Sequence, residues 1–264
     1  MLFRASCLAL VTIAAAFASC PRASADGTSA DDSGVLSDPA SQLAIAVMSD
    51  NAALARSVLA ANPGAVNIDT GQGRTPLILA SMTTHPALVK LLLDHGADLA
   101  READDGAIGN AVTAAFFAMN GARLTGMGEK PDQRRHQDAL EVLRLVAAKR
   151  NGLELLVRRG PTQMSALMIA AEAGAPEAVR ILLDAGANPN TANGGRYTAL
   201  DYAVGRKPSW STASTADRVE VAQLLLAAGA RVDHRAADQM SSVERARSSG
   251  IPAMAALFPG RPGR

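Results

Sequence analysis

The 264-residue chain is poor in cysteine and in aromatic residues. Its two cysteines, Cys7 and Cys20, both lie within the first 25 residues, so the remainder has no disulfide and no cysteine nucleophile or metal ligand. Aromatic residues make up only 3% of the chain, although 48% of it is hydrophobic. The core must therefore be built from Ala, Leu and Val, which favours short, closely packed helices over a β-sandwich.

The chain also lacks the motifs of common active sites and an excess of either charge. It has no glycine-rich phosphate-binding loop and no HExxH pair of metal-binding histidines, so we predict no catalysis, no metal and no cofactor. With 26 basic and 25 acidic residues, it shows no sign of binding nucleic acid or an anionic membrane surface. The four histidines are scattered: we expect structural roles for His85, His95 and His136, and a solvated loop position for His234.

The first 25 residues predict export from a bacterial cell. Arg4 precedes an apolar run over residues 5–18, as in a secretory signal peptide. Two endings remain open: cleavage after Ala25, which follows a small-x-small pattern, or lipidation of Cys20 at a lipobox-like Phe-Ala-Ser-Cys. The first predicts a periplasmic or secreted protein and the second a membrane-anchored lipoprotein. Residues 26–37, rich in Asp, Ser, Gly and Thr, are expected to form a disordered tether.

Beyond residue 38 the same landmarks recur along the chain. Three short motifs each open an apolar helical run, and the last two are 33 residues apart: Thr75-Pro76-Leu77, Ser165-Ala166-Leu167 and Thr198-Ala199-Leu200. Three leucine-rich runs are each followed, three residues after the last leucine, by a glycine: Gly96, Gly186 and Gly229. Agreement at several landmarks indicates repeated pairs of helices that must stack to bury their apolar faces.

These motifs resemble those of ankyrin repeats, including the Gly-Ala-Asp at residues 96–98 that opens the loop, or finger, to the next repeat. The resemblance implies an all-α ankyrin-repeat solenoid of about six helix-turn-helix units over residues 38–260. Less typical helix pairs are expected at residues 39–48 with 52–61, 108–119 with 137–149, and 240–248 with 252–258. Ile78, Met168 and Asp201 replace the histidine that commonly follows the Thr-Pro-Leu motif, so packing is expected to replace its inter-repeat hydrogen bonds.

Two intra-repeat loop insertions interrupt the rhythm, mainly at residues 120–135 and 205–214, with a further excess at 150–163. The two main insertions lie between the helices of one repeat, which places them at the edge opposite the fingers. Trp210, in the second insertion, either contacts a partner or folds back as a lid over a helix. The basic cluster of the first insertion is either an anion site or a solvated loop; it comprises Lys130, Arg134, Arg135 and His136.

The resemblance implies a non-catalytic protein-binding module, here a monomer in the bacterial cell envelope, that recognises another protein through its concave finger and helix surface. Neutralising a toxin, assisting an envelope enzyme and scaffolding a complex all remain open. The candidate contact residues are Gln72, Arg74, Gln163, Met164, Arg196, Tyr197 and Trp210. The alternative is a small-molecule or ion binder that uses the edge insertions, with polar groups from Asp217, Arg218 and Glu220.

Overall fold

The structure is a computed structural model that describes residues 38–104, 109–124, 133–149, 153–159, 162–205, 211 and 213–258, with only the backbone of 120–124 and 158–159. The predicted signal peptide, Cys20 and the predicted tether lie outside the described residues, as do Lys130 and Trp210. Among the described residues, no helix is long and apolar enough to cross a membrane.

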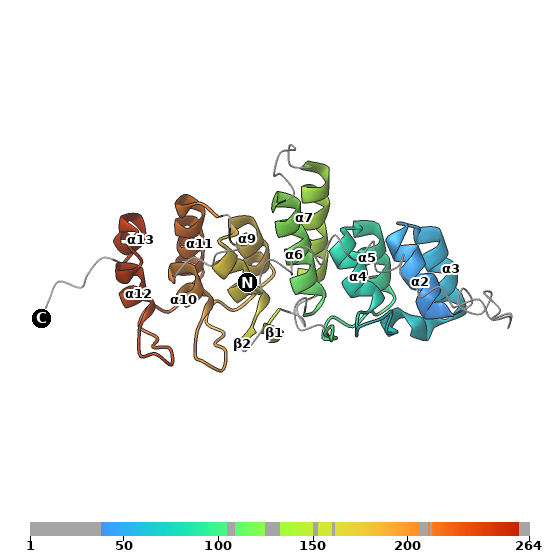
Figure 1. The fold of residues 1–264 in the computed structure, drawn as a ribbon, viewed down its shortest axis with the longest axis horizontal. Helices are drawn as coiled ribbons and strands as arrows, with labels where there is room; N and C mark the ends of the chain where they lie inside the picture. Colours follow the sequence, from blue (N-terminus) through green and yellow to red (C-terminus); the bar gives the residue numbers. More distant parts are fainter. Residues whose placement is uncertain are drawn as a thin grey trace, which may run out of the picture. The chain divides into compact units, whose positions relative to one another are not determined.

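The described residues of the repeat region form six helix pairs in a row (Figure 1). The first helices of the pairs are α2 (Pro39–Met48), α4 (Pro76–Thr83), α6 (Ala111–Leu124), α8 (Ala166–Ala173), α10 (Ala199–Val204) and α12 (Ser242–Ser248). The second helices are α3 (Ala52–Ala61), α5 (Pro86–Asp94), α7 (Gln133–Ala147), α9 (Pro176–Asp184), α11 (Thr215–Ala227) and α13 (Pro252–Ala256). Each first helix packs on the next first helix, and each second helix on the next second helix. The predicted all-α repeat solenoid is confirmed.

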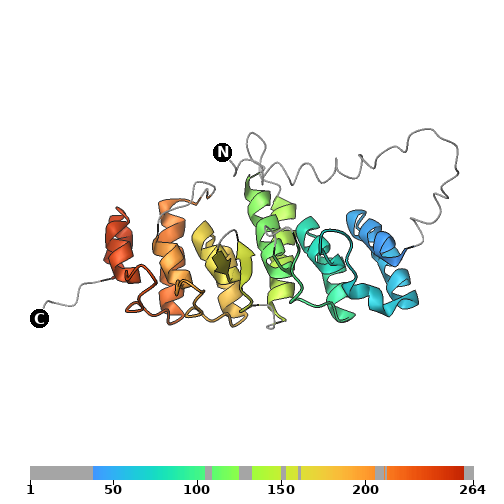
Figure 2. The same ribbon diagram turned by 60° about the horizontal axis from the view of Figure 1, so that its bottom comes forward.

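The two edges of the row differ. The finger edge carries the long connections from one pair to the next, and the turn edge carries the turns within each pair (Figure 1). Figure 2 brings the finger edge toward the viewer. The fold thus places the turns within pairs, including the insertion between α10 and α11, at one edge and the connections between pairs at the other.

Local chemistry explains where the helices begin and end. Thr75 is extended and its hydroxyl accepts a hydrogen bond from the Ile78 N–H at 3.3 Å, while Pro76 occupies the first helical position. At the other end of the first helix, Thr84 and Gly174 adopt left-handed conformations that stop α4 and α8. The Thr-Pro-Leu and Ser-Ala-Leu motifs therefore start helices as predicted.

The core is a continuous stripe of Ala, Leu and Val that runs between the two layers of helices. Leucines recur at equivalent places in successive repeats: Leu77, Leu167 and Leu200 are each at most 2% exposed. Because a single pair leaves such a stripe open, each repeat depends on its neighbours for burial.

The described residues of the first predicted insertion are helical. α6 and α7 contain 14 and 15 residues, against 8 and 9 for α4 and α5, and they extend beyond the neighbouring pairs at the turn edge (Figure 1). The bounds predicted for these helices, 108–119 and 137–149, were therefore wrong on the side of the insertion: the observed helices run several residues further into it. Arg134, Arg135 and His136 consequently lie on α7 rather than in a loop.

The second insertion, residues 205–214, lies between α10 and α11 as predicted. Its described end is fastened to the preceding repeat, where the Ser211 hydroxyl donates to the Ala173 carbonyl at 2.7 Å. Ala213 packs against the turn at Gly174, which has a φ of +67° and leaves no room for a side chain. This edge of the fold is thus held in place by contacts between repeats four and five.

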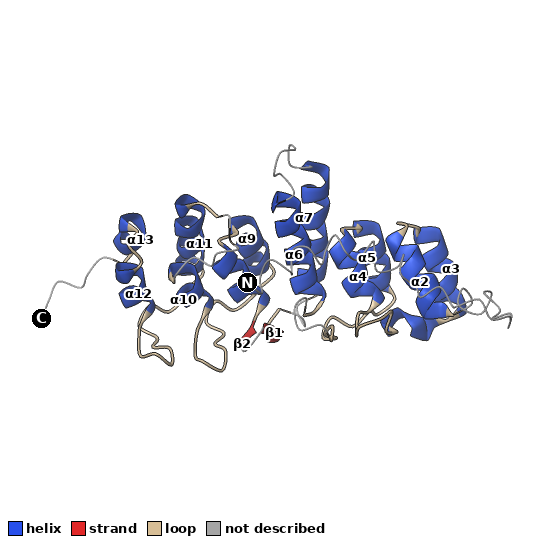
Figure 3. Cartoon of the chain, in the orientation of Figure 1, coloured by secondary structure: helices blue, strands red, loops and turns tan. Residues whose placement is uncertain are grey.

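A small β-hairpin precedes α8, which the sequence did not predict (Figure 3). Strands β1 (Val157–Arg159) and β2 (Thr162–Met164) are antiparallel, with Val157 opposite Met164. Both of these side chains are only 2% exposed, so they anchor the hairpin to the core. The described residues of the excess at 150–163 therefore belong to an enlarged finger between repeats three and four.

Candidate functional site

Three fingers share one backbone turn immediately before a first helix. We name them by the repeat that they begin: finger two (residues 69–75), finger five (192–198) and finger six (235–241). In each, a backbone N–H bonds to the carbonyl four residues later: Thr70 to Arg74 at 2.8 Å, Asn193 to Tyr197 at 3.1 Å and Ala236 to Met240 at 3.2 Å. The three turns therefore present equivalent positions along one edge of the domain.

The position two residues before each helix cap has a left-handed backbone. It is Gly73 in finger two, Arg196 in finger five and Gln239 in finger six, with φ of 69°, 59° and 64°. Glycine adopts this conformation freely, whereas a residue with a side chain loses on the order of 1 kcal/mol or more. Gln72, at φ 60°, is a further example. Side chains kept in this conformation on a surface loop are a recognised feature of functional sites.

Asn193 organises finger five, and the sequence analysis missed it. Its amide nitrogen donates to the Gln163 carbonyl at 3.1 Å and to the Tyr202 hydroxyl at 3.0 Å. Its amide oxygen accepts from the N–H groups of Gly195 and Tyr197, both at 3.0 Å. The side chain is 7% exposed and all four of its hydrogen bonds are made, so it fixes the turn rigidly.

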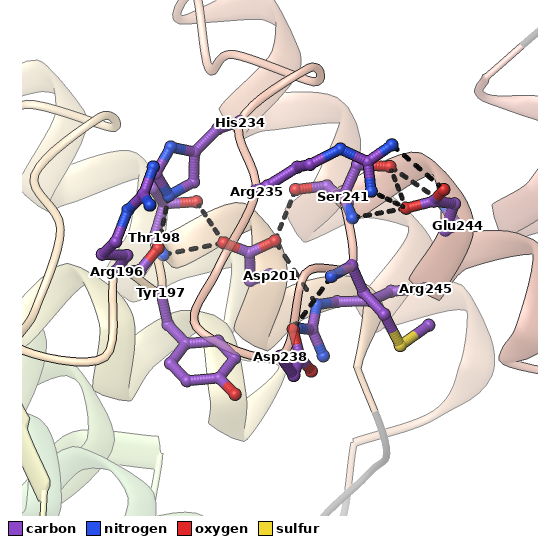
Figure 4. A network of polar contacts seen from close by, with 12 residues as sticks. Arg196, Tyr197, Thr198, Asp201, His234, Arg235, Asp238, Ser241, Glu244 and Arg245 are labelled. Carbon is purple, nitrogen blue, oxygen red and sulfur yellow. Dashed lines mark hydrogen bonds and ion pairs between the residues drawn. The ribbon is translucent and has the colours of Figure 1, made fainter.

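Asp201 joins repeats five and six (Figure 4). It is 3% exposed, and one carboxylate oxygen accepts from the N–H and hydroxyl of Thr198 at 2.9 and 3.0 Å. The other oxygen accepts from the Ser242 hydroxyl at 2.7 Å and lies 3.6 Å from the Arg245 Nε. We expected packing to replace the inter-repeat hydrogen bonds of the missing histidine; at this junction that expectation was wrong, because Asp201 makes such bonds itself.

Arg245 connects the same network to the surface of finger five. Its guanidinium hydrogen-bonds Asp238 and lies 5.0 Å from the centre of the Tyr197 ring, a cation–π distance. The Tyr197 ring in turn lies 5.9 Å from that of Tyr202. Tyr197, a predicted contact residue, is therefore clamped between its own repeat and the last one (Figure 4).

Two acids of this region, Asp238 and Glu244, have pKa values lowered by their partners. Burial acts to raise the pKa of Asp238, but hydrogen bonds from Arg245 and from the Met240 N–H lower it overall. The N–H and hydroxyl of Ser241, followed by Arg235, lower the pKa of Glu244. Burial raises the pKa of the Tyr202 phenol, which is therefore neutral and donates or accepts as a hydroxyl.

The structure brings three of the predicted contact residues together around Asn193. Gln163 and Arg196 are exposed, and Tyr197 is half-buried. In finger two, Gln72 is exposed and Arg74 half-buried. Met164, however, is 2% exposed and belongs to the core, because it lies opposite Val157 in the hairpin and points inward. We therefore withdraw Met164 as a surface contact.

Three of the four histidines connect neighbouring segments, whereas a ring nitrogen of the fourth, His95, lies 2.8 Å from the Leu91 carbonyl of its own helix. His85 lies 3.3 Å from Asp50 and His136 lies 3.1 Å from Glu177, each pair joining adjacent repeats. His234 was expected in a solvated loop, but it is half-buried and its ring nitrogen contacts the Arg196 carbonyl. It thus connects the segment before finger six to finger five.

The polar groups suggested for a small-molecule site are already occupied. Asp217 caps α11 through the Ser214 N–H at 2.9 Å. Arg218 is 5% exposed, with its pKa lowered by burial, and it donates to the Ala203 carbonyl at 2.9 Å. Glu220 pairs with Arg180 of the preceding repeat. In the part of the chain that is described, no cluster of His, Cys, Asp or Glu could hold a metal ion.

Comparison with known proteins identifies the family. The family model described as ankyrin repeats (3 copies) matches residues 25–121 and 140–236, which together make up more than half of the chain. The chain therefore belongs to the ankyrin repeat family. None of the curated proteins compared with the chain matches it.

Solved structures show the same fold. The ankyrin repeat protein EF0377 is 21% identical with a TM-score of 0.62, covering 82% of this chain and 96% of that one. An ankyrin repeat domain from Acinetobacter baumannii is 24% identical with a TM-score of 0.61, covering 82% and 95%. A chain from the complex of the predatory endopeptidase Bd0816 of Bdellovibrio bacteriovorus with the immunity protein Bd3460 is 19% identical with a TM-score of 0.56, covering 82% and 96%. Ankyrin repeats are protein-interaction modules and generally non-catalytic scaffolds.

Proposed function

We propose that this chain is a non-catalytic, monomeric protein-binding module of the bacterial cell envelope. A partner protein contacts fingers two and five and the adjoining faces of the first helices. The observation that carries the proposal is the pair of exposed side chains, Gln72 and Arg196, held on left-handed backbone at the finger edge. A glycine would be more stable at either position, so the retained side chains are best explained by a contact that they make outside the domain.

The rigidity of finger five supports the same conclusion. Asn193 fixes the backbone of Arg196 and Tyr197, and Arg245 lies against the Tyr197 ring, so binding has to order little of the loop backbone. A surface fixed in advance retains more of its interaction free energy as affinity. Such a surface is suited to recognising one folded partner.

The envelope location follows from the signal-like segment at residues 1–25. Attachment to the membrane would come from lipidation of Cys20 if the chain is not cleaved after Ala25. The similarity to a chain from an endopeptidase–immunity protein complex supports neutralising a toxin as one duty, beside assisting an envelope enzyme or scaffolding a complex.

Site-specific photocrosslinking in living cells tests this proposal. A photoreactive amino acid replaces Gln72 or Arg196 in two variants, and exposed Ala87, at the turn edge on α5, in a matched control. We expect one protein adduct of defined mass from the two finger positions and none from position 87. Equal labelling from all three positions, or no adduct at all, would contradict the proposal.

The purified partner then allows an affinity test. Arg196→Gly removes the guanidinium while relaxing the left-handed backbone, so the fold should be as stable as before or more so. We expect weaker binding by calorimetric titration with an unchanged or higher Tm. Unchanged affinity would exclude Arg196 as a contact, and turnover of a substrate by the purified domain would refute a purely binding role.

A further inference from the structure

Fingers two and five are each supported by the connection that follows them. The carbonyl three residues before the helix cap accepts a backbone N–H from that connection: Gln72 from Asp104, and Gly195 from Ala237, both at 2.9 Å. Asp104 lies in the segment that leads into repeat three, and Ala237 lies in finger six. The shape of each finger therefore depends partly on the position of the following repeat.

The stems of the same two fingers repeat this arrangement. Eight residues before each cap is an asparagine whose side-chain oxygen accepts a backbone N–H from the next connection. Asn67 accepts from Asp98 at 2.7 Å, and Asn190 accepts from Arg231 at 2.8 Å. A displacement of one repeat is therefore transmitted to the finger before it.

The repeats that provide these two supports differ. Repeat three has helices of 14 and 15 residues and packs between two pairs, α4 with α5 and α8 with α9. The last repeat has helices of 7 and 5 residues, which pack against α10 and α11. A repeat with little apolar burial opens at a lower free energy than one packed on both sides. Finger five therefore rests on a support that is displaced more easily than that of finger two.

Side chains of the last repeat and its finger also reach finger five (Figure 4). The Arg245 guanidinium lies 5.0 Å from the centre of the Tyr197 ring, and a ring nitrogen of His234 contacts the Arg196 carbonyl. With the backbone bond to finger six, each of residues 195–197 contacts repeat six or the segment before it. The left-handed backbone of Arg196, at φ 59°, persists only where the surrounding structure holds it.

We propose that docking of the last repeat positions finger five for binding, and that Arg245 is the positioning residue through which it acts. While the last repeat is docked, Arg196 and Tyr197 are held in the orientation that meets a partner. When it undocks, finger five loses this support and binds more weakly, whereas finger two keeps its own support. Because such coupling is reciprocal, a partner on finger five also holds the last repeat in place. This inference rests on the proposed protein-binding function and adds how its site is regulated.

The burial of Arg245 favours positioning over direct contact with a partner. Its side chain is 14% exposed, its guanidinium hydrogen-bonds Asp238, and its Nε lies 3.6 Å from Asp201. The exposed Arg196, in contrast, presents its side chain to solvent. Arg245 therefore acts on a partner through the finger that it supports.

Amide hydrogen exchange of the purified protein, followed by NMR, tests the positioning without any partner. The test variant is Arg245→Ala, which removes the cation from the Tyr197 ring. Arg245→Lys keeps a cation beside that ring and Asp238, so it should restore the contact. The matched control is Arg247→Ala, an exposed arginine on the same helix.

We expect Arg245→Ala to speed exchange of the Gly195 and Tyr197 amides by at least about fivefold, the effect of losing a cation–π contact of ordinary strength. The Thr70 and Arg74 amides of finger two should stay within about twofold, because they lie far from the change. Arg245→Lys and Arg247→Ala should both resemble the unaltered protein.

A change in the finger itself gives an independent measurement if Arg245→Ala does not fold. Tyr197→Leu removes the ring that Arg245 contacts, whereas Tyr197→Phe keeps it. We expect Tyr197→Leu to speed amide exchange in α12 while α3 is unchanged, and Tyr197→Phe to have no effect. A role of Arg245 confined to its own repeat would not produce this result, because Tyr197 belongs to finger five.

Photocrosslinking relates the positioning to binding. At equal protein level, the adduct from position 196 should fall at least about fivefold in the Arg245→Ala background and return with Arg245→Lys.

Three results would overturn the proposal: unchanged exchange at Gly195 and Tyr197 in Arg245→Ala, an equal increase in finger two, or an adduct that Arg245→Ala does not reduce. Any of these, with adducts formed by the unaltered protein, would remove the regulation and leave the protein-binding function intact. A loosened finger five in a protein that forms no adduct would instead count against the cellular function alone.

Discussion

The first and last repeats both cover an open end of the solenoid, but they are attached by different forces. The first repeat buries large apolar side chains of both its helices, including Leu43, Val47, Val58 and Leu59, each at most 2% exposed. The last repeat is shorter, with helices of 7 and 5 residues, and the buried side chains of these helices are Ser242, Ala246 and Met254. It compensates with hydrogen bonds and ion pairs centred on Asp201 and Arg245 (Figure 4).

The two ends of the solenoid therefore differ in how strictly their attachment depends on exact geometry. Apolar burial stabilises without requiring exact geometry, whereas a buried polar network stabilises only when every partner is in place. The first repeat is therefore expected to tolerate small displacements. The last repeat should open at lower free energy, and it does so beside the residues that we assign to binding.

The largest effect on stability should come from removing a buried apolar side chain that attaches the first repeat. Leu59→Ala, on α3, should lower the free energy of unfolding by about 2–5 kcal/mol, because it removes buried methyl groups and leaves a cavity. Urea unfolding followed by circular dichroism measures this change. Arg56→Ala, on the exposed face of the same helix, should stay within about 0.5 kcal/mol. Similar losses in both variants would show that the first repeat is not held by apolar burial.

Breaking the polar attachment should have a smaller and more local effect. Asp201→Ala removes the buried acceptor of the Ser242 hydroxyl and the carboxylate that lies 3.6 Å from the Arg245 Nε, and should cost about 2–3 kcal/mol. Hydrogen exchange should show lost protection in α12 and α13 while α2 and α3 are unchanged. The control is Asp217→Ala, another capping acid whose capping partner is Ser214 of its own repeat, with an expected cost of about 1 kcal/mol. Uniform loss along the chain would contradict a local role for Asp201.

The smallest effect on stability should appear at low pH, and it should differ between the last repeat and the first. The lowered pKa values of Asp238 and Glu244 mean that their contribution to stability is complete above the ordinary carboxyl range and is lost as pH falls through the lowered values. Hydrogen exchange should therefore show α12 losing protection before α3 once the pH falls below about 4. Simultaneous loss at both ends would mean that these carboxylates do not secure the last repeat.

The helices were predictable because their signals are local. A capping threonine or serine, a proline in the first turn and a glycine after the leucines act within a few residues, so α4, α5, α8 and α9 were found from their motifs. The insertion before α7 was placed correctly but read as a loop. Its apolar spacing was too weak to reveal that both neighbouring helices continue into it.

The candidate site was predictable only in part. Gln72 and Arg196 were chosen from their places before a helix start, and both prove to be exposed. Met164 was chosen by the same rule, yet the unpredicted hairpin turns its side chain into the core. Asn193 was missed, although an asparagine just before a Gly-Gly turn is a signal that could have identified it.

The sequence by itself determined the repeat, the helix starts marked by capping motifs and the aliphatic character of the core, because these depend on residues close together in the chain. Tertiary structure decided which polar side chains meet. Asp201 and Ser242 are 41 positions apart, and Asn193 and the Gln163 carbonyl are 30 apart, so only stacking brings them within hydrogen-bonding distance. Stacking likewise left the Arg196 guanidinium without a partner among the described residues, since a charge is paired or unpaired according to its neighbours in space.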